Sequence, residues 1–354
     1  MAKERLFNLP QTRGSFQIKG KISGVEKDNF FVEKATKNGG SFRVINFGVS
    51  YDEHATVFVG ISGSTRDKVY FSKRNPETKK TETKAVNWNQ RENFHEEGWN
   101  IIGVNCGIEQ KRNDDGSIAN ITKSMVEYDA AQYLNVYLAD DMDVFMSGNI
   151  EFNSFTNKNG EVTHGINYRP TRIYACKKPI DFEAEDYKPQ HDFKQTIVFK
   201  DIEQEKEDDK PTGRFVVSAW IVNYASIENA NFIIKDKGLA TLFKKGLKAN
   251  TAIDVWGNID CRIVVEDVPS DECWGEADPT KRINNSVVRE MVITGADPSS
   301  RDTETYNEKE MNKAFEAIRK AKNAEDNYAD SKDDAINWGE ESGINDDEDI
   351  PWGD

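Results

Sequence analysis

The sequence predicts a mainly β protein with two copies of one folding unit, followed by a short helix and an acidic C-terminal tail. Three observations support this. Strand-like alternation of apolar and polar residues recurs along most of the chain. Two distant parts of the chain repeat each other in order. The acidic residues gather at the end, where residues 323–354 hold 12 Asp or Glu and one Lys in a 354-residue chain of net charge −15.

The first copy contains three strands, a helix and two further strands. The helix is predicted over residues 127–138, where Ala, Gln and Leu fall at helical spacing. The turn Asn157-Lys158-Asn159-Gly160 separates the last two strands. The strands are expected at residues 15–25, 42–51, 56–62, 144–155 and 165–175.

The second copy repeats this order. Residues 40–51 align without gaps on residues 213–224, and Gly148-Asn149-Ile150 matches Gly257-Asn258-Ile259. We interpret both glycines as structural, because glycine within a strand permits a barrel to bend sharply. The strands are expected at residues 195–203, 213–224, 230–234, 252–265 and 286–295, with a helix at residues 237–247.

Three strands, a helix and two strands is the order of the OB fold, a five-stranded Greek-key barrel that binds ligands across strands 2 and 3. We therefore predict two tandem OB folds. The predicted segments are a first domain at residues 1–180 with a basic and aromatic insertion at 63–91, an acidic linker at 181–192, a second domain at 193–300, a helical segment at 301–322 and a disordered acidic tail at 323–354.

The insertion at residues 63–91 suggests nucleic-acid binding. It holds eight basic residues against three acidic ones, with Tyr70, Phe71 and Trp88 interleaved. Single-stranded nucleic acid requires positive charge along its phosphates and aromatic faces for its bases. Residues 68–74 and 81–89 are expected to form a long hairpin over the groove. The alternative is a solvated hairpin whose lysines serve solubility only.

Further candidates follow from where OB grooves lie. Strand alternation favours a core position for Phe47 and for its aligned counterpart Trp220. The DNA-binding candidates are Arg43, Tyr51, Arg66, Lys68, Tyr70, Phe71, Lys73, Arg74, Lys79, Lys80, Lys84, Trp88, Arg91, Lys158, Tyr168, Arg169, Arg172, Arg214, Trp220, Tyr224, Trp256, Trp274 and Arg282.

The tail carries four acids, Asp346, Asp347, Glu348 and Asp349, directly before Ile350, Pro351 and Trp352. This ending resembles that of bacterial and bacteriophage single-stranded DNA-binding proteins, which end an acidic tail with a short apolar motif, and the overall shape of the chain most resembles the phage-encoded members. The resemblance implies sequence-nonspecific coating of single-stranded DNA in replication, recombination and repair. It also implies that the tail binds a polymerase, helicase, primase or recombinase. Here Gly353 and Asp354 follow Trp352, which departs from the bacterial pattern.

Other classes are less well supported. No apolar run would span a bilayer and no signal-peptide core is present, so we expect a cytoplasmic protein, in the host bacterium if phage-encoded. The four cysteines lack the spacing of a zinc site, and no phosphate loop or HExxH motif occurs, so we expect no metal, no cofactor and no catalysis. The open alternative is a replication mediator that binds DNA weakly and mainly recruits an enzyme. An acidic DNA mimic conflicts with the basic insertion. We expect a monomer or a homodimer.

Overall fold

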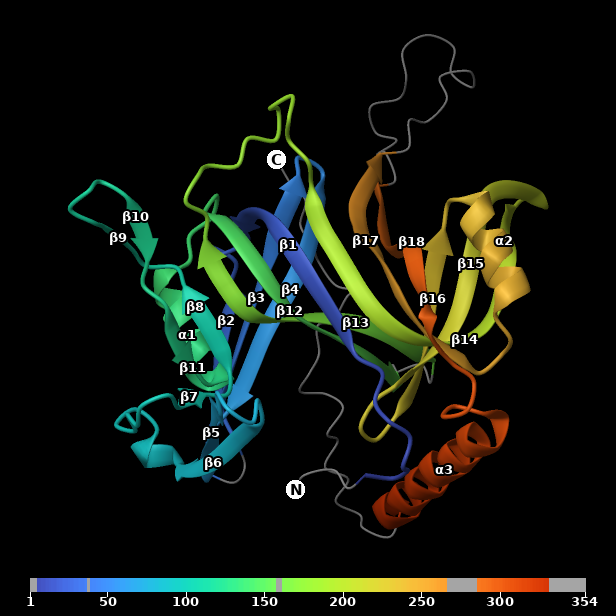
Figure 1. Cartoon of the computed structure of the whole chain (residues 1–354), viewed down its shortest axis with the longest axis horizontal. Helices are drawn as coiled ribbons and strands as arrows, with labels where there is room; N and C mark the ends of the chain where they lie inside the picture. The colour runs from blue at the N-terminus through green and yellow to red at the C-terminus, as the bar shows by residue number, and fades with distance from the viewer. Residues whose placement is uncertain (1–4, 37–38, 157–160, 266–284, 331–354) are drawn as a thin grey trace.

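The computed structural model describes residues 5–36, 39–156, 161–265 and 285–330. This part of the chain is mainly β, and its strands form two barrels that lie side by side (Figure 1). A small three-stranded sheet and a long helix extend from the barrels on opposite sides.

The first barrel closes through pairings of consecutive and distant strands. β1 pairs with β3 and β12, β3 pairs with β4, and β12 pairs with β13. One parallel contact between β4 and β13 closes the barrel. The elements are β1 (Gly14–Ser23), β3 (Ser41–Asp52), β4 (Ala55–Ser64), α1 (Glu127–Tyr137), β12 (Asp143–Thr156) and β13 (Val162–Ala175).

The second barrel has the same order of strand pairing. β14 pairs with β15 and β17, β15 pairs with β16, β17 pairs with β18, and a parallel contact between β16 and β18 closes it. Each copy thus has the predicted order of three strands, a helix and two strands. The elements are β14 (Gln190–Glu207), β15 (Lys210–Val222), β16 (Ile227–Ile234), α2 (Lys237–Gly246), β17 (Thr251–Val265) and β18 (Asn285–Asp302).

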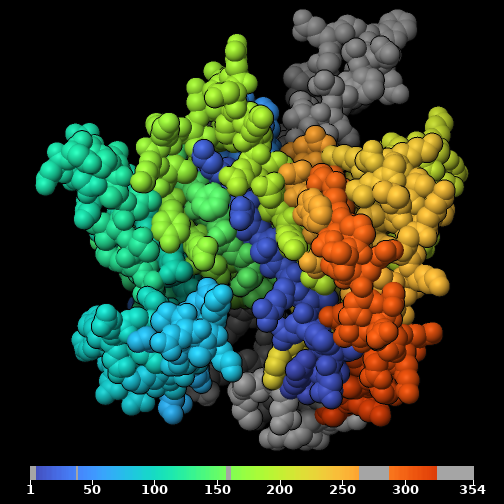
Figure 2. All heavy atoms as spheres, in the orientation of Figure 1, coloured from blue at the N-terminus to red at the C-terminus, as the bar shows by residue number. Residues whose placement is uncertain are grey.

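The two barrels are joined by direct strand pairing. β1 and β14 run antiparallel, with Phe16 opposite Phe193. Phe16 also lies opposite Gly148 in its own barrel, as Phe193 lies opposite Gly257. These two phenylalanines therefore occupy equivalent positions, and the halves are arranged about this pair. In the space-filling view the N-terminal strand runs between the two halves (Figure 2).

Both repeated glycines lie at matching irregularities. The register shifts between Ser147 and Gly148 and again between Trp256 and Gly257. A Cβ at Gly148 would lie 2.0 Å from the carbonyl oxygen of Arg169, and a Cβ at Gly257 would lie 1.8 Å from that of Val292. The structural interpretation of these glycines agrees with this geometry, because no side chain fits at either bulge.

The ungapped repeat alignment is wrong in its pairing of Phe47 with Trp220. Phe47 is 2% exposed inside the first barrel. Trp220 lies on the opposite face of β15 from the buried Val217, Ala219 and Ile221. The strand pairings place Trp220 at the position of Ser50, three residues from Phe47, and because side chains alternate between faces along a strand, an odd displacement exchanges core and surface.

The predicted linker is partly strand and partly packed loop. Its last residues, from Gln190, already belong to β14, and Ile180 just before it is buried. The hydroxyl of Tyr187 donates to the carbonyl oxygen of Tyr51 at 2.7 Å. The segment thus packs against the first barrel.

The insertion is larger than predicted and has its own core. Val69, Phe71 and Val86 pack with Val126 and Tyr128 at the start of α1. Figure 2 shows this lobe at the lower left of the molecule. The strands β2 and β7–β11 were not predicted, because each is too short to show a clear alternation. The additional elements are β2 (Phe31–Ala35), β5 (Lys68–Arg74), β6 (Thr81–Asn87), η1 (Trp88–Gln90), β7 (Asn100–Ile101), β8 (Val104–Gly107), β9 (Gln110–Arg112), β10 (Ile118–Asn120) and β11 (Lys123–Met125).

A long C-terminal helix, α3 (Glu308–Asp330), packs on the second barrel. Met311 and Ala314 are buried beside Val222, together with Phe7 and Leu9 of the N-terminal segment. The predicted boundary at residue 322 is wrong, since α3 continues to Asp330 through a segment without Gly or Pro. Residues 331–354, including the predicted tail motif, lie outside the described residues.

Candidate nucleic-acid interface

An exposed phenylalanine lies on the outer face of the first barrel. Phe58 of β4 is 52% exposed, whereas its neighbours Val57 and Val59 face the core. Across the sheet Phe58 lies opposite Gly48, and Gly60 lies opposite Asn46. The side chains next to the ring are therefore small or polar, and they leave one face of the ring accessible to a ligand.

The same face of the chain leads from β4 into the insertion. Gly60, Ser62 and Ser64 follow Phe58 at alternate positions of β4, over about 20 Å from Phe58 to Ser64. Ser64, Arg66, Lys68 and Tyr70 then line one cavity of about 90 Å³ together with Ile102 and Glu127. Tyr70 and Ile102 are each 51% exposed. We call the seven residues Phe58, Gly60, Ser62, Ser64, Arg66, Lys68 and Tyr70 the Phe58–Tyr70 track.

Five of the basic residues predicted in the insertion are available to a ligand. Their side chains are exposed and make no ion pair within the described residues. They are Arg66, Lys68, Arg74, Lys79 and Lys80. Lys68, Tyr70 and Arg74 share one face of β5, because they lie at alternate positions of this strand.

The other three basic residues of the insertion have partners. Lys73 donates from Nζ to the carbonyl oxygen of Glu97 at 2.9 Å, and Lys84 pairs with Glu96 at 2.5 Å. Arg91 makes two hydrogen bonds to Asp129, at 2.7 and 2.9 Å, which raise the pKa of its guanidinium. These side chains hold the lobe together and are not free for phosphate.

Four predicted aromatic residues lie in cores or packed contacts. Tyr51 and Phe71 are each 4% exposed, and the Tyr51 ring stacks on His191 at 4.1 Å. Tyr168 packs edge-on against Phe16 at 5.4 Å, and burial raises its pKa. Trp88 lies under the Arg91 guanidinium, 4.1 Å from its ring centre. Tyr51, Phe71 and Tyr168 are removed from the candidate interface because they are packed against other side chains, whereas Trp88 is half-buried and also lines the cavity beside Tyr70.

Arg43 is also engaged elsewhere. Its guanidinium lies 4.0 Å from the centre of the Tyr128 ring and pairs with Glu33 at 3.2 Å. Hydrogen bonds from Tyr128 and Arg43 lower the pKa of Glu33. This group connects β2 and β3 to α1.

Arg169 lies beside the track. Its Nη1 donates to the Ser62 hydroxyl at 3.3 Å, while its Nε pairs with Glu151 at 2.5 Å. Arg172 is exposed on the same strand, opposite Ser147. Lys158 lies outside the described residues.

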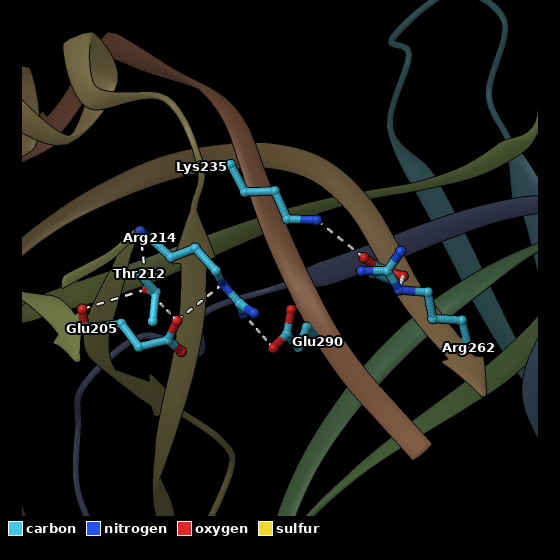
Figure 3. Close-up of polar contacts among 7 residues, drawn as sticks. Glu205, Thr212, Arg214, Lys235, Arg262 and Glu290 are labelled. Carbon is cyan, nitrogen blue, oxygen red and sulfur yellow. Dashed lines mark hydrogen bonds and ion pairs between the residues drawn. The ribbon is translucent and has the colours of Figure 1, made fainter. Parts of the chain in front are cut away.

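Three cations of the second barrel, Arg214, Lys235 and Arg262, have acidic partners. Arg214 lies between two acids, Glu205 at 3.2 Å and Glu290 (Figure 3). Asp260 forms ion pairs with both Lys235, at 3.2 Å, and Arg262, at 3.4 Å. A phosphate would have to displace these carboxylates, so the predicted role of Arg214 meets competition within the chain.

The aromatic candidates of the second barrel do not form a second track. Trp220 is held between Lys200, 3.8 Å from its ring centre, and Phe315 of α3, at 5.0 Å. Tyr224 and Trp256 are 48% and 42% exposed. A Cβ at Gly295 would lie 2.5 Å from the Trp256 ring nitrogen, so this indole covers the backbone of β18. Trp274 and Arg282 lie outside the described residues.

Phe58 was missed by the sequence reasoning although a signal existed. Val57, Val59 and Ile61 alternate with Thr56, Phe58 and Gly60. The period of two places Phe58 on the polar face, where a phenylalanine requires an explanation.

Two further properties concern the described residues as a whole. No helix there is long and apolar enough to cross a membrane. The same residues contain no group of three His, Cys, Asp or Glu arranged to hold a metal ion, and Cys273 falls outside them.

Comparison with known proteins returned structural neighbours and one family. Wild-type single-stranded DNA-binding protein from Thermus aquaticus has a TM-score of 0.36 and 10% identity, covering 81% of this chain and 93% of that one. A deletion variant of the same protein scores 0.35, also at 10% identity, covering 81% and 94%. A Replication Protein A heterotrimer bound to single-stranded DNA scores 0.20 at 10% identity, covering 87% and 98%.

No curated protein matches the chain. The model of the YorF family matches residues 13–331, which is most of the sequence. The chain therefore belongs to the YorF family.

Proposed function

We propose that this protein binds single-stranded DNA without sequence preference through the Phe58–Tyr70 track, as a non-catalytic coat. The observation that carries the proposal is the pattern of the track. It has an exposed aromatic ring at each end, small residues next to Phe58, and, next to Tyr70, two cations that make no ion pair within the described residues.

Each part of the track suits a single strand. Exposed rings offer faces on which bases stack, and stacking contributes about 1–3 kcal/mol per base. Glycine and serine along β4 let a nucleotide approach the sheet closely. Arg66 and Lys68, with Arg74, Lys79 and Lys80 nearby, supply charge for the phosphates. Neither stacking nor phosphate contact reads base edges, so binding is tolerant of sequence.

We further propose that both five-stranded barrels are OB folds. In that fold strands 2 and 3 form the binding face, which corresponds to β3 and β4 of the first barrel. The equivalent region of the second barrel is partly covered, since Trp220 packs against Phe315 of α3. The first barrel is therefore the main DNA-binding unit in this proposal.

A role in replication, recombination or repair follows if the coat also recruits other proteins. Residues 346–352 combine four acids with Ile350, Pro351 and Trp352, a composition suited to a basic, apolar pocket on a partner. We propose this segment as the attachment point for a polymerase, helicase, primase or recombinase.

The test is fluorescence anisotropy of labelled oligo(dT) and of a matched duplex, at low and moderate salt. We expect clear preference for the single strand. Phe58→Ala and Tyr70→Ala should each weaken binding about 5- to 150-fold, the range that corresponds to about 1–3 kcal/mol. Both rings are half exposed, so the variants should remain folded, which circular dichroism and thermal unfolding will check.

Tyr224→Ala is the matched control. Tyr224 is 48% exposed, close to the 51% of Tyr70, but belongs to the second barrel. We expect its affinity to stay within twofold of the original protein. Equal binding of duplex and single strand would refute the proposed function. Loss of binding in Tyr224→Ala with no effect of the two track variants would move the site to the second barrel.

A further inference from the structure

The cavity at the insertion end of the Phe58–Tyr70 track has an apolar wall. Val69, Trp88 and Val126 line it, and so do Tyr70 and Ile102, which are each 51% exposed, so the cavity opens to solvent beside them. Its volume is about 90 Å³. A cavity of about 150 Å³ holds a whole benzene ring. This one therefore takes the edge of a nucleobase and leaves the rest of the base outside, next to the Tyr70 ring.

A carboxylate is held at a fixed place in this cavity. Glu127 is the first residue of α1, and its neighbours Val126 and Tyr128 are 7% and 9% exposed in the core of the insertion. The first turn of α1 rests directly on β4, because a Cβ at Gly63 would lie 2.3 Å from the backbone nitrogen of Tyr128. This contact brings Glu127 to the same cavity as Ser64, the residue after Gly63.

The polar groups of the cavity have no partners from the chain. Neither the Glu127 carboxylate nor the Ser64 hydroxyl makes a hydrogen bond or an ion pair within the described residues. The helix dipole accounts for an acid in the first turn of α1. It does not account for Arg66 and Lys68, which line the same cavity without pairing to that acid. The cavity therefore offers an acceptor and a donor, and its two cations leave it net positive for a phosphate.

We propose that this cavity takes the Watson–Crick edge of one base of the bound strand and prefers guanine there, an inference that rests on the proposed function. A carboxylate accepts hydrogen bonds and donates none. Guanine is the DNA base whose Watson–Crick edge presents two adjacent donors, N1–H and the N2 amine, so it can bind both oxygens of Glu127. The Ser64 hydroxyl can donate to guanine O6. Thymine presents O2 and O4, which the carboxylate repels. The rest of the track reads no base edges, so the preference is confined to one position.

The experiment is anisotropy with strands of equal length that repeat TTG, TTA, TTC or TTI, where I is inosine, against oligo(dT). Isolated guanines between thymines avoid quadruplex formation. Bidentate contacts discriminate between bases by about 5- to 150-fold. Glu127 is half-buried and guanine occupies the cavity in only some registers, so we expect the TTG strand to bind about 3- to 10-fold more tightly than oligo(dT). Inosine lacks the N2 amine, so the TTI strand should bind more weakly than the TTG strand, and so should the TTA and TTC strands.

Two glutamine variants locate the preference. Glu127→Gln keeps the shape of the side chain but replaces one acceptor by a donor, so the ratio of TTG to oligo(dT) affinity should fall below about twofold. Glu77→Gln is the matched control. Glu77 is an exposed acid of the same insertion that does not line the cavity, and its replacement changes the net charge equally. The ratio should stay at its original value in this control.

The outcomes separate this inference from the proposed function. Absence of binding to every strand would overturn both. Binding of oligo(dT) that Tyr70→Ala weakens, together with equal affinity for the TTG strand, would overturn the guanine preference alone. The assignment to Glu127 would also fail if Glu127→Gln kept the preference, or if Glu77→Gln abolished it as well, since the effect would then follow net charge.

Discussion

Replacing Arg66, Lys68 and Arg74 together by glutamine removes three exposed positive charges from one surface of the insertion. None of the three makes an ion pair within the described residues, so no buried partner loses its counter-charge. Surface changes of this kind alter the free energy of unfolding by about 0.5 kcal/mol or less. The variant therefore isolates the contribution of phosphate contacts to binding.

The expected magnitude follows from counterion release. For single strands the slope of log K against log salt concentration is about −0.7 per neutralised phosphate. If each of the three side chains contacts one phosphate, the slope becomes shallower by about 2. Between 50 and 200 mM salt the original protein should then lose about 20-fold more affinity than the variant loses.

The assay is a salt titration of oligo(dT) binding followed by anisotropy. The control changes Lys206, Lys210 and Lys320 to glutamine, three exposed lysines of the second half without ion pairs among the described residues. We expect the slope of the control to change by less than about 0.5, since these residues lie away from the track. Equal changes of slope in the two triple variants would show that only net charge matters, and would refute the assignment of phosphate contacts to the insertion.

Two stability predictions accompany this one. Gly257→Ala should lower the free energy of unfolding by about 1–3 kcal/mol, because the added Cβ would lie 1.8 Å from a carbonyl oxygen. The control is Gly246→Ala, whose added Cβ meets nothing within 4 Å and which should be neutral or stabilising. Urea denaturation of both variants measures the difference. Tyr51→Phe should cost about 1–3 kcal/mol, because the buried Cys261 amide that donates to the hydroxyl at 3.0 Å loses its acceptor. Burial raises the pKa of Tyr51 from 10.0 to about 12, so the hydroxyl stabilises the fold fully below pH 10 and loses that effect between pH 10 and 12. The stability gap between Tyr51→Phe and the original protein should therefore narrow as pH rises through this window, and a constant gap in denaturation at pH 9 and 11.5 would contradict the assignment.

The barrel strands could be predicted from the sequence because two independent signals agree. Period-two alternation marks each strand, and the repeat gives the same order twice. The helix predicted at residues 127–138 ends one residue later than α1, and the one at 237–247 one residue later than α2. Shorter strands such as β7, which has two residues, carry too little pattern to be found.

The basic and aromatic composition of the site could be predicted, but the individual residues that are free to bind could not. The insertion stood out as basic and aromatic, and Lys68 and Tyr70 are exposed there as expected. Lys73 and Arg91 belong to the same basic stretch, yet one donates to Glu97 and the other binds Asp129, a residue 38 positions away. Local sequence cannot show which charges a distant segment will neutralise.

The pairing of Phe47 with Trp220 shows how small the deciding error can be. Both copies contain an aromatic residue in the same motif, and the ungapped alignment assigns both to the core. Phe16 and Phe193 are equivalent, and the pairings of β1 with β3 and of β14 with β15 then place Trp220 at the position of Ser50, three residues beyond Phe47. A displacement by an odd number of residues exchanges the two faces of a strand, so Trp220 lies outside the barrel, where Lys200 and α3 cover it.

The difference between the two barrels follows from what each outer face carries. In the second barrel Trp220 and Val222 give α3 and the N-terminal Phe7 an apolar surface to cover, and this contact buries Met311 and Ala314. In the first barrel the corresponding strands carry Asn46, Gly60 and Ser62, which offer too little apolar area to hold a helix. The face that cannot hold a segment of its own chain is the face left accessible, and it is also where Phe58 is exposed and where the unpaired cations of the insertion begin. One barrel thus holds α3 and the segment around Phe7, while the other leaves the surface of the proposed Phe58–Tyr70 track free.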